Sequence, residues 1–123
     1  MFSTIVVGTD GSDRAGIAVD HAAGLAAKWG ATVHLVSAAK DSGTPADLAP
    51  QVALAREHGV TVETHQAPGN PVAVILDVAG RVGADLIVVG NRGMEGSRRL
   101  LGSVPNNVAH HSSCAVLIVP TGA

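Results

Sequence analysis

The sequence predicts an α/β fold in which helices cover both faces of a five-stranded parallel sheet. Five short runs rich in β-branched residues alternate with segments that repeat apolar residues every three or four positions. This alternation indicates parallel strands joined by right-handed helical crossovers. Apolar residues make up 46% of the 123 residues, yet there are only one Trp, one Phe and no Tyr. That length and composition predict one domain over residues 1–123.

The first half of the chain predicts two strands around a long helix. Thr4–Gly8 is continuously apolar, as expected of a strand covered on both faces. Asp10–Asp13 is a turn that can begin a helix, and Gly30 ends that helix. Thr32–Ala38 is the second strand, and residues 39–49 read as a loop. The inward stripe of the helix is Ala15, Ala18, Val19, Ala22, Leu25, Ala26 and Trp29.

The middle of the chain predicts a short helix, a strand and a further helix. Pro50 begins the short helix, which runs to His58 and ends at Gly59. Val60–His65 alternates as a third strand does. Asn70 followed by Pro71 marks the start of the next helix, which ends at Gly83. Its predicted inward residues are Val72, Ile75, Leu76, Ala79 and Val82.

The last part of the chain predicts a phosphate-binding segment between a strand and a helix. Leu86–Val89 is the fourth strand, a final helix follows Ser103, and Ala115–Val119 is the fifth strand. Gly90, Gly93 and Gly102 lie between this strand and Ser103, where bare N–H groups and a helix N-terminus can hold phosphate oxygens. The alternative is that the glycines only turn the chain. The Walker pattern is absent, because no Lys follows Gly102.

Three segments resemble the universal stress protein family: Val-Gly-Thr-Asp-Gly-Ser after the first strand, the glycine segment, and the closing strand Ala115–Pro120. The glycine segment combines Val-Val-Gly-Asn-Arg-Gly with Leu-Leu-Gly-Ser-Val-Pro-Asn-Asn-Val. The resemblance implies the strand order 3-2-1-4-5, as in adenine-nucleotide alpha-hydrolase-like folds. It also implies a homodimer paired through the last strand, and ATP or a related adenine nucleotide as ligand.

The resemblance also assigns roles to individual residues. Thr9 and Asp10 would line the adenosine pocket, Ala38 would offer backbone groups to the adenine edge, and Gly90 would lie near the ribose. The residues around the phosphates would be Arg92, Gly93, Gly102, Ser103 and Val104. The chain has one residue fewer than the family motif between Gly93 and Gly102, and a shorter segment between the second and third strands.

Other polar residues have competing interpretations. Asp10 would bind ribose hydroxyls or a cation, or would simply accept hydrogen bonds within its own turn. None of the six histidines has a spacing from Asp or Glu that predicts a metal site, so any metal would be Mg²⁺ carried by nucleotide phosphates. Cys114 reads as a small hydrophobic residue.

Three functions therefore compete. The leading hypothesis is a nucleotide-binding stress or regulatory module; the others are a weak ATPase and a dimeric interaction protein with an empty site. No catalytic set is visible, so we expect hydrolysis to be absent or slow. The net charge of −2 and the lack of a basic stripe argue against nucleic acid. With no leader segment or bilayer-length apolar run, we expect a cytoplasmic protein without membrane contact.

Overall fold

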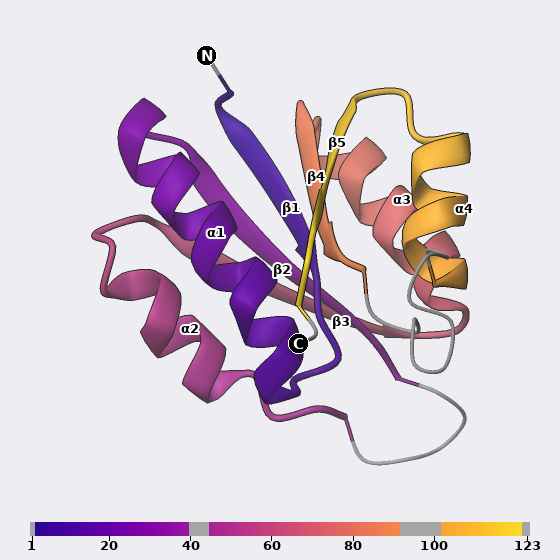
Figure 1. Ribbon diagram of the computed structural model, residues 1–123, viewed down its shortest axis with the longest axis horizontal. Coiled ribbons are helices and arrows are strands. Elements are labelled where there is room, and N and C mark those ends of the chain that lie inside the picture. The colour runs from indigo at the N-terminus through magenta and orange to yellow at the C-terminus, as the bar shows by residue number, and fades with distance from the viewer. Residues whose placement is uncertain (1, 40–44, 92–101, 122–123) are drawn as a thin grey trace.

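The computed structural model describes residues 2–39, 45–91 and 102–121. Within these residues five strands alternate with four helices in three layers (Figure 1). The elements are β1 (Thr4–Gly8), α1 (Asp13–Trp29), β2 (Thr32–Ala39), α2 (Ala49–Arg56), β3 (Val62–Pro68), α3 (Pro71–Val82), β4 (Leu86–Gly90), α4 (Ser103–His111) and β5 (Ala115–Val119).

The five strands form one parallel sheet in the order β3-β2-β1-β4-β5. This confirms the predicted α/β fold and its strand order. Helices α1 and α2 cover one face of the sheet, and α3 and α4 cover the other (Figure 1). Because every strand points the same way, all the carboxyl ends lie at one edge, at the bottom of Figure 1.

Two apolar clusters, one on each face, hold the layers together. On the α1 and α2 side, Ile5, Val7, Val33 and Leu35 are fully buried beneath the alanine face of α1. On the other side Val6 packs with residues of α3 and α4. Consecutive residues of β1 thus enter opposite cores, which explains why the central strand is apolar at every position.

Several predicted boundaries were wrong, and the largest differences are at α2 and β3. Helix α2 ends at Arg56, two residues before the predicted end, and Gly59 (φ +78°) belongs to the turn that follows it. Strand β3 runs from Val62 to Pro68, whereas the alternation predicted Val60–His65. Pairing with β2 continues as far as Ala39 opposite Pro68, so β2 rather than hydrophobicity sets the length of this edge strand.

The predicted inward faces of the helices needed smaller corrections. In α3, Ile75 and Ala79 are buried as predicted, but Val74 and Val78 are buried too and were not included. In α1, Trp29 is 39% exposed rather than inward. Its ring meets Phe2 edge-on at the helix end, with centroids 5.2 Å apart. The stripe therefore leaves the core at the last turn of α1.

At the amino edge of the sheet, Asp85 binds the start of β1. Its carboxylate accepts hydrogen bonds from the backbone N–H groups of Ser3 (2.9 Å) and Thr4 (3.1 Å) and from the Ser3 hydroxyl. Desolvation alone would raise the pKa of Asp85, but these hydrogen bonds outweigh it and hold the pKa below its ordinary value. In the described residues, no helix has both the length and the apolar character that crossing a bilayer requires.

Candidate functional site

The strand order reverses between β1, the middle strand of the sheet, and its neighbour β4. From β1 the chain runs outward to β2 and β3, and it then returns across α3 to β4 and β5. Open parallel sheets bind ligands beyond the carboxyl ends of their strands at such a reversal. The residues there are Thr9 and Asp10 after β1, and Gly90 at the end of β4. The fold therefore brings these three predicted site residues to one edge.

Thr9 is tied into the fold by both its backbone and its side chain. Its N–H donates to the carbonyl oxygen of Val36 on β2 (2.9 Å), and its hydroxyl donates to Oε1 of the buried Gln51. The same hydroxyl oxygen accepts the N–H of Gly11 (3.1 Å), whose φ of +82° suits glycine. Thr9 is thus a structural residue of this loop, whatever else it contacts.

Asp10 and Ser12 satisfy the backbone of the turn that leads into α1. Oδ1 of the exposed Asp10 accepts the Ser12 N–H (3.0 Å), which is the turn role that the sequence allowed. Oγ of Ser12 accepts the Ala15 N–H (3.1 Å) and so caps α1. Gln51 donates from Nε2 to the Ser12 carbonyl oxygen (2.9 Å), which fixes α2 against the same turn.

Gly90 lies against Thr121, the residue that follows Pro120 after β5. A Cβ atom at position 90 would stand 2.9 Å from Cγ2 of Thr121, so a larger residue would displace it. Oδ1 of Asn91 accepts the Thr121 N–H (2.9 Å), and the Asn91 N–H donates to the Val119 carbonyl oxygen (3.0 Å). Packing alone is therefore a sufficient reason for glycine at position 90.

Helix α4 begins at the same edge, because it runs antiparallel to the β5 strand that follows it (Figure 1). Its N-cap residue is Gly102, with φ −62° and ψ 165°, and no side chain accepts a hydrogen bond there. Ser103 and Val104 are the first two residues of the helix, and Pro105 has no N–H to donate. The N–H groups of Ser103 and Val104 thus form a small donor site at the positive end of the helix dipole.

The remaining predicted site residues divide into two groups. Ala38 is near the carboxyl end of β2, where it pairs with Ala67 and packs against the core on the α3 side. Arg92 and Gly93 lie outside the described residues. Sequence reasoning missed Gln51, Asn91 and Thr121, which brace this edge. A local sequence pattern cannot predict them, because each forms a hydrogen bond with a residue at least 30 positions away.

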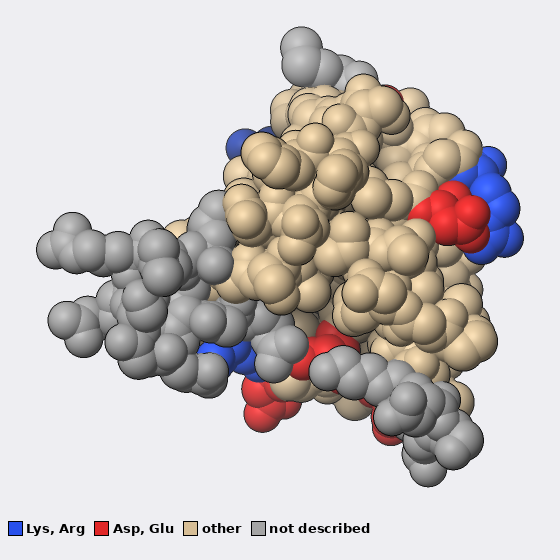
Figure 2. All heavy atoms as spheres, turned by 90° about the vertical axis from the view of Figure 1, so that its right-hand side faces the viewer, with Lys and Arg blue, Asp and Glu red and all other residues tan. Residues whose placement is uncertain are grey.

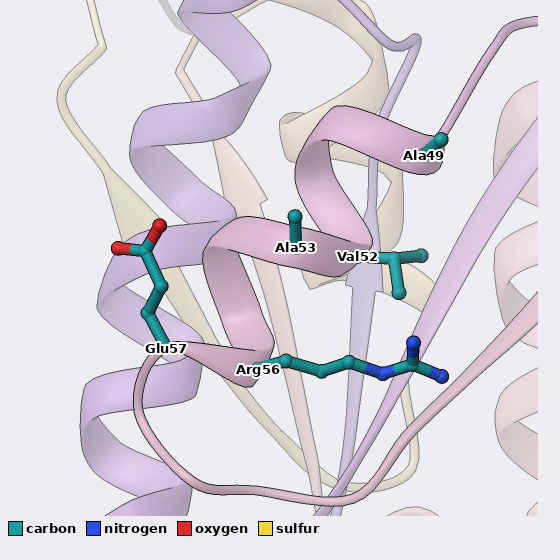
Figure 3. Close-up of a pocket in the computed structure, with 5 residues that line it drawn as sticks. All are labelled: Ala49, Val52, Ala53, Arg56 and Glu57. Carbon is teal, nitrogen blue, oxygen red and sulfur yellow. The ribbon is translucent and has the colours of Figure 1, made fainter.

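A shallow hollow elsewhere does not resemble a ligand site. It follows one helix, α2, and its walls are Ala49, Val52, Ala53, Arg56 and Glu57 (Figure 3). The charged ends of Arg56 and Glu57 extend to opposite sides in this view. Because the polar groups diverge, the hollow has no converging set of contacts for a small molecule.

The face formed by α3 and α4 carries few charged side chains (Figure 2). Those that this view shows lie around its margin, at the upper left, at the top, at the right and along the lower rim, with uncharged surface between them. The described part of this face has no basic stripe of the kind that binds nucleic acid backbones.

Comparison with known proteins identifies relatives across the whole chain. The family model for the universal stress protein family matches residues 1–54 and 37–120. A universal stress protein of Mycobacterium tuberculosis is 37% identical over 98% of this chain and 97% of its own length. A second, from Methanocaldococcus jannaschii, is 33% identical over 97% of this chain and 82% of its own.

Solved structures give the same result. A crystal structure of a universal stress protein in complex with cAMP has a TM-score of 0.85 at 35% identity and covers 98% of this chain and 99% of its own. A universal stress protein of Archaeoglobus fulgidus in complex with dAMP has a TM-score of 0.75 at 28% identity, covering 94% and 96%. With its fold, its residue patterns and full-length relatives in agreement, this chain belongs to the universal stress protein family.

Proposed function

We propose that this chain binds an adenine nucleotide at the carboxyl edge of its sheet and acts as a regulatory, stress-response module. The observation that carries the proposal is the N-terminus of α4, which begins at Gly102 without a side-chain cap, at the same carboxyl edge of the sheet at which the strand order reverses. A phosphate at that position would accept hydrogen bonds from backbone N–H groups and would be stabilised by the helix dipole.

The two similar structures support adenosine as the rest of the ligand. They were determined with cAMP and dAMP, each of which has one phosphate group and one adenine. In our proposal Thr9, Asp10 and Ala38 contact the adenosine, Gly90 is near the ribose, and Ser103 and Val104 donate to phosphate. Arg92 and Gly93 complete the phosphate contacts, and Mg²⁺ accompanies ATP as the counterion of its phosphates.

The role of one N–H group in this proposal can be tested at Ser103, the first residue of α4. Ser103→Pro removes one N–H at the helix position where proline is best tolerated, and Gly102 already has the extended conformation that precedes proline. Ser103→Ala removes the hydroxyl and keeps the N–H. We expect Ser103→Pro to weaken ATP or cAMP binding by about tenfold or more in titration calorimetry, since a hydrogen bond to a charged group contributes about 1.5–3 kcal/mol.

Ser103→Ala is the matched control and should bind nearly as the unmodified chain does. Equal affinity of Ser103→Pro and Ser103→Ala, with helix content unchanged, would reject α4 as the phosphate site. Mass spectrometry of small molecules released from the purified protein identifies the nucleotide. Release of no nucleotide, together with no heat on titration, would reject the function itself.

We also propose that β5 pairs with its counterpart in a second copy. β5 is an edge strand, and three of its five side chains, Val116, Leu117 and Ile118, are only partly buried. The opposite edge strand, β3, instead presents polar side chains such as Glu63 and Gln66, which discourage pairing. Twofold pairing of β5 would give a closed dimer. Light scattering should report twice the chain mass, and a monomer at high concentration would contradict this.

A further inference from the structure

Two histidines and a glutamate meet on the face of the sheet that α3 covers. His34 is on β2, and Glu63 and His65 are on the neighbouring edge strand β3. The strand register places His34 opposite Glu63, and His65 is two residues further along on the same face. Nδ1 of His34 is 2.9 Å from Nε2 of His65, and one ligand atom from each of the three residues lies within 4.8 Å of the others.

The position of the cluster combines a buried end with an open one. His34 is 6% exposed and pairs on its other side with Val6 of the apolar core, whereas Glu63 is exposed and His65 is half-buried. Burial lowers the pKa of His34; Glu63 acts to raise it, and His65 lowers it further. The net effect favours the neutral imidazole, which is the form that has a free lone pair for a metal.

We propose that His34, Glu63 and His65 form a binding site for a divalent transition-metal ion, with Zn²⁺ as the ion that fits best. Two imidazoles and one carboxylate are a ligand set that zinc accepts, with water completing the coordination. Mg²⁺ and Ca²⁺ prefer all-oxygen sites and are disfavoured here. The assignment is independent of nucleotide binding.

The distances in the cluster suit such an ion after a small adjustment. At Zn–N distances near 2.0–2.1 Å, two nitrogens of a tetrahedral site are about 3.3–3.4 Å apart, and two cis nitrogens of an octahedral site about 2.9 Å. At the observed separation of 2.9 Å, the rings of His34 and His65 are joined by one hydrogen bond. An ion replaces that shared proton, and the donor ring then carries its proton on the other nitrogen. Since β3 is an edge strand, the His65 side chain can move by the required fraction of an ångström.

The proposed metal site is separate from the proposed nucleotide edge. His34 precedes Ala38 by four residues in β2, and a strand rises about 3.3 Å per residue, so the two positions are about 13 Å apart. Glu63 and His65 are likewise on the side of β2 away from β1. A metal bound here would join β2 to the edge strand β3 rather than contact phosphate.

The test uses tag-free, chelator-treated protein titrated with Zn²⁺ in calorimetry. We expect one ion per chain, and at least about tenfold weaker binding after either Glu63→Gln or His65→Gln, since even outer-shell changes cost metal sites about 10–100-fold. Glu63 is exposed, so Glu63→Gln keeps the fold if His65→Gln does not. Co²⁺ should give the visible spectrum of a site with nitrogen ligands, and excess Mg²⁺ should not displace it.

The matched control is His58→Gln. His58 forms the other histidine–carboxylate pair, with Nε2 2.7 Å from Oδ1 of Asp20, but no third ligand joins it within the described residues. Its substitution should leave Zn²⁺ binding unchanged. No Zn²⁺ binding by the unmodified chain, equal binding by Glu63→Gln and the unmodified chain, or an equal loss in His58→Gln would each overturn the proposal. Retained nucleotide binding in Glu63→Gln would confirm that the two sites are separate.

Discussion

Helices α1 and α4 begin at the same edge of the sheet, but only α1 has a side-chain cap for its first N–H groups. At α1 the side chains of Thr9, Asp10 and Ser12 accept hydrogen bonds from the turn and from the helix itself. At α4 the N-cap is Gly102, which has no side chain to offer. The start of α1 therefore receives hydrogen-bond acceptors from its own side chains. The start of α4 receives no such acceptor from its N-cap residue, so its N–H groups can donate to another molecule. This difference is the reason that we propose α4, rather than α1, as the helix that holds phosphate.

The largest expected effect comes from giving α4 a cap of its own. Gly102→Asp places a carboxylate where we propose a phosphate, and the φ and ψ of Gly102 are accessible to aspartate. Loss of two hydrogen bonds to a charged group, at about 1.5–3 kcal/mol each, predicts at least about a hundredfold loss of nucleotide affinity. Calorimetric titration with ATP and cAMP measures it.

The control for this change is Gly80→Asp, which adds the same charge in α3 at an open position. It should bind nucleotide as the unmodified chain does. The free energy of unfolding of Gly102→Asp should equal that of the unmodified chain or exceed it by a few tenths of a kcal/mol, because aspartate caps helices somewhat better than glycine. Undiminished binding by a folded Gly102→Asp protein would remove the basis of the comparison.

A moderate effect on stability, with little effect on binding, is expected at the other helix. Ser12→Ala removes the cap of α1 and should lower the free energy of unfolding by about 1 kcal/mol, measured by urea denaturation. Ser113→Ala, an exposed serine before β5, is the control and should change little. If both variants unfold at the same urea concentration, the Ser12 cap contributes nothing to stability. In that case α1 and α4 would not differ in the stability that capping provides.

The smallest effect concerns Asp85, whose carboxylate accepts hydrogen bonds from backbone N–H groups, as a bound phosphate would. Its folded pKa is below the ordinary value of 3.8, so its contribution to stability is present above that pH and is lost as the pH falls through the lowered value. We expect a loss below about 1 kcal/mol, because Asp85 is only partly buried and solvent screens its charge. Melting temperatures of Asp85→Asn and the unmodified chain should differ above about pH 4 and converge as the pH falls further, through the lowered pKa. Parallel curves would contradict this.

The sequence predicts most of the fold because its elements are set by local patterns. β1 and β4 are apolar throughout, and Gly30 and Gly83 end α1 and α3 in the left-handed conformation, as their positions predict. β3 was predicted less well because its residues are mostly polar, and its length is set by pairing with β2. A pattern of side chains cannot report a boundary that the neighbouring backbone decides.

The candidate site was predictable only in part, for a related reason. Glycine patterns indicate where the backbone turns, and they correctly placed Gly90 and Gly102 at one edge. The hydrogen bond from Thr9 to Gln51 depends on how α2 docks, which no local pattern encodes. The histidine cluster was missed because His34 and His65 are 31 residues apart. A clue was present, since Glu63 and His65 alternate on one face of a strand.

The contact between Thr121 and Gly90 has a consequence for how the protein is made. Gly90 precedes Thr121 by about thirty residues in the chain, so the end of β4 cannot reach its final packing until β5 and Thr121 have been added. Only when Thr121 docks and Asn91 accepts its N–H is the start of the glycine segment held in place. Completion of the proposed ligand-binding edge therefore depends on insertion of β5, and a chain that lacks β5 would lack the contacts that hold Gly90 and Asn91.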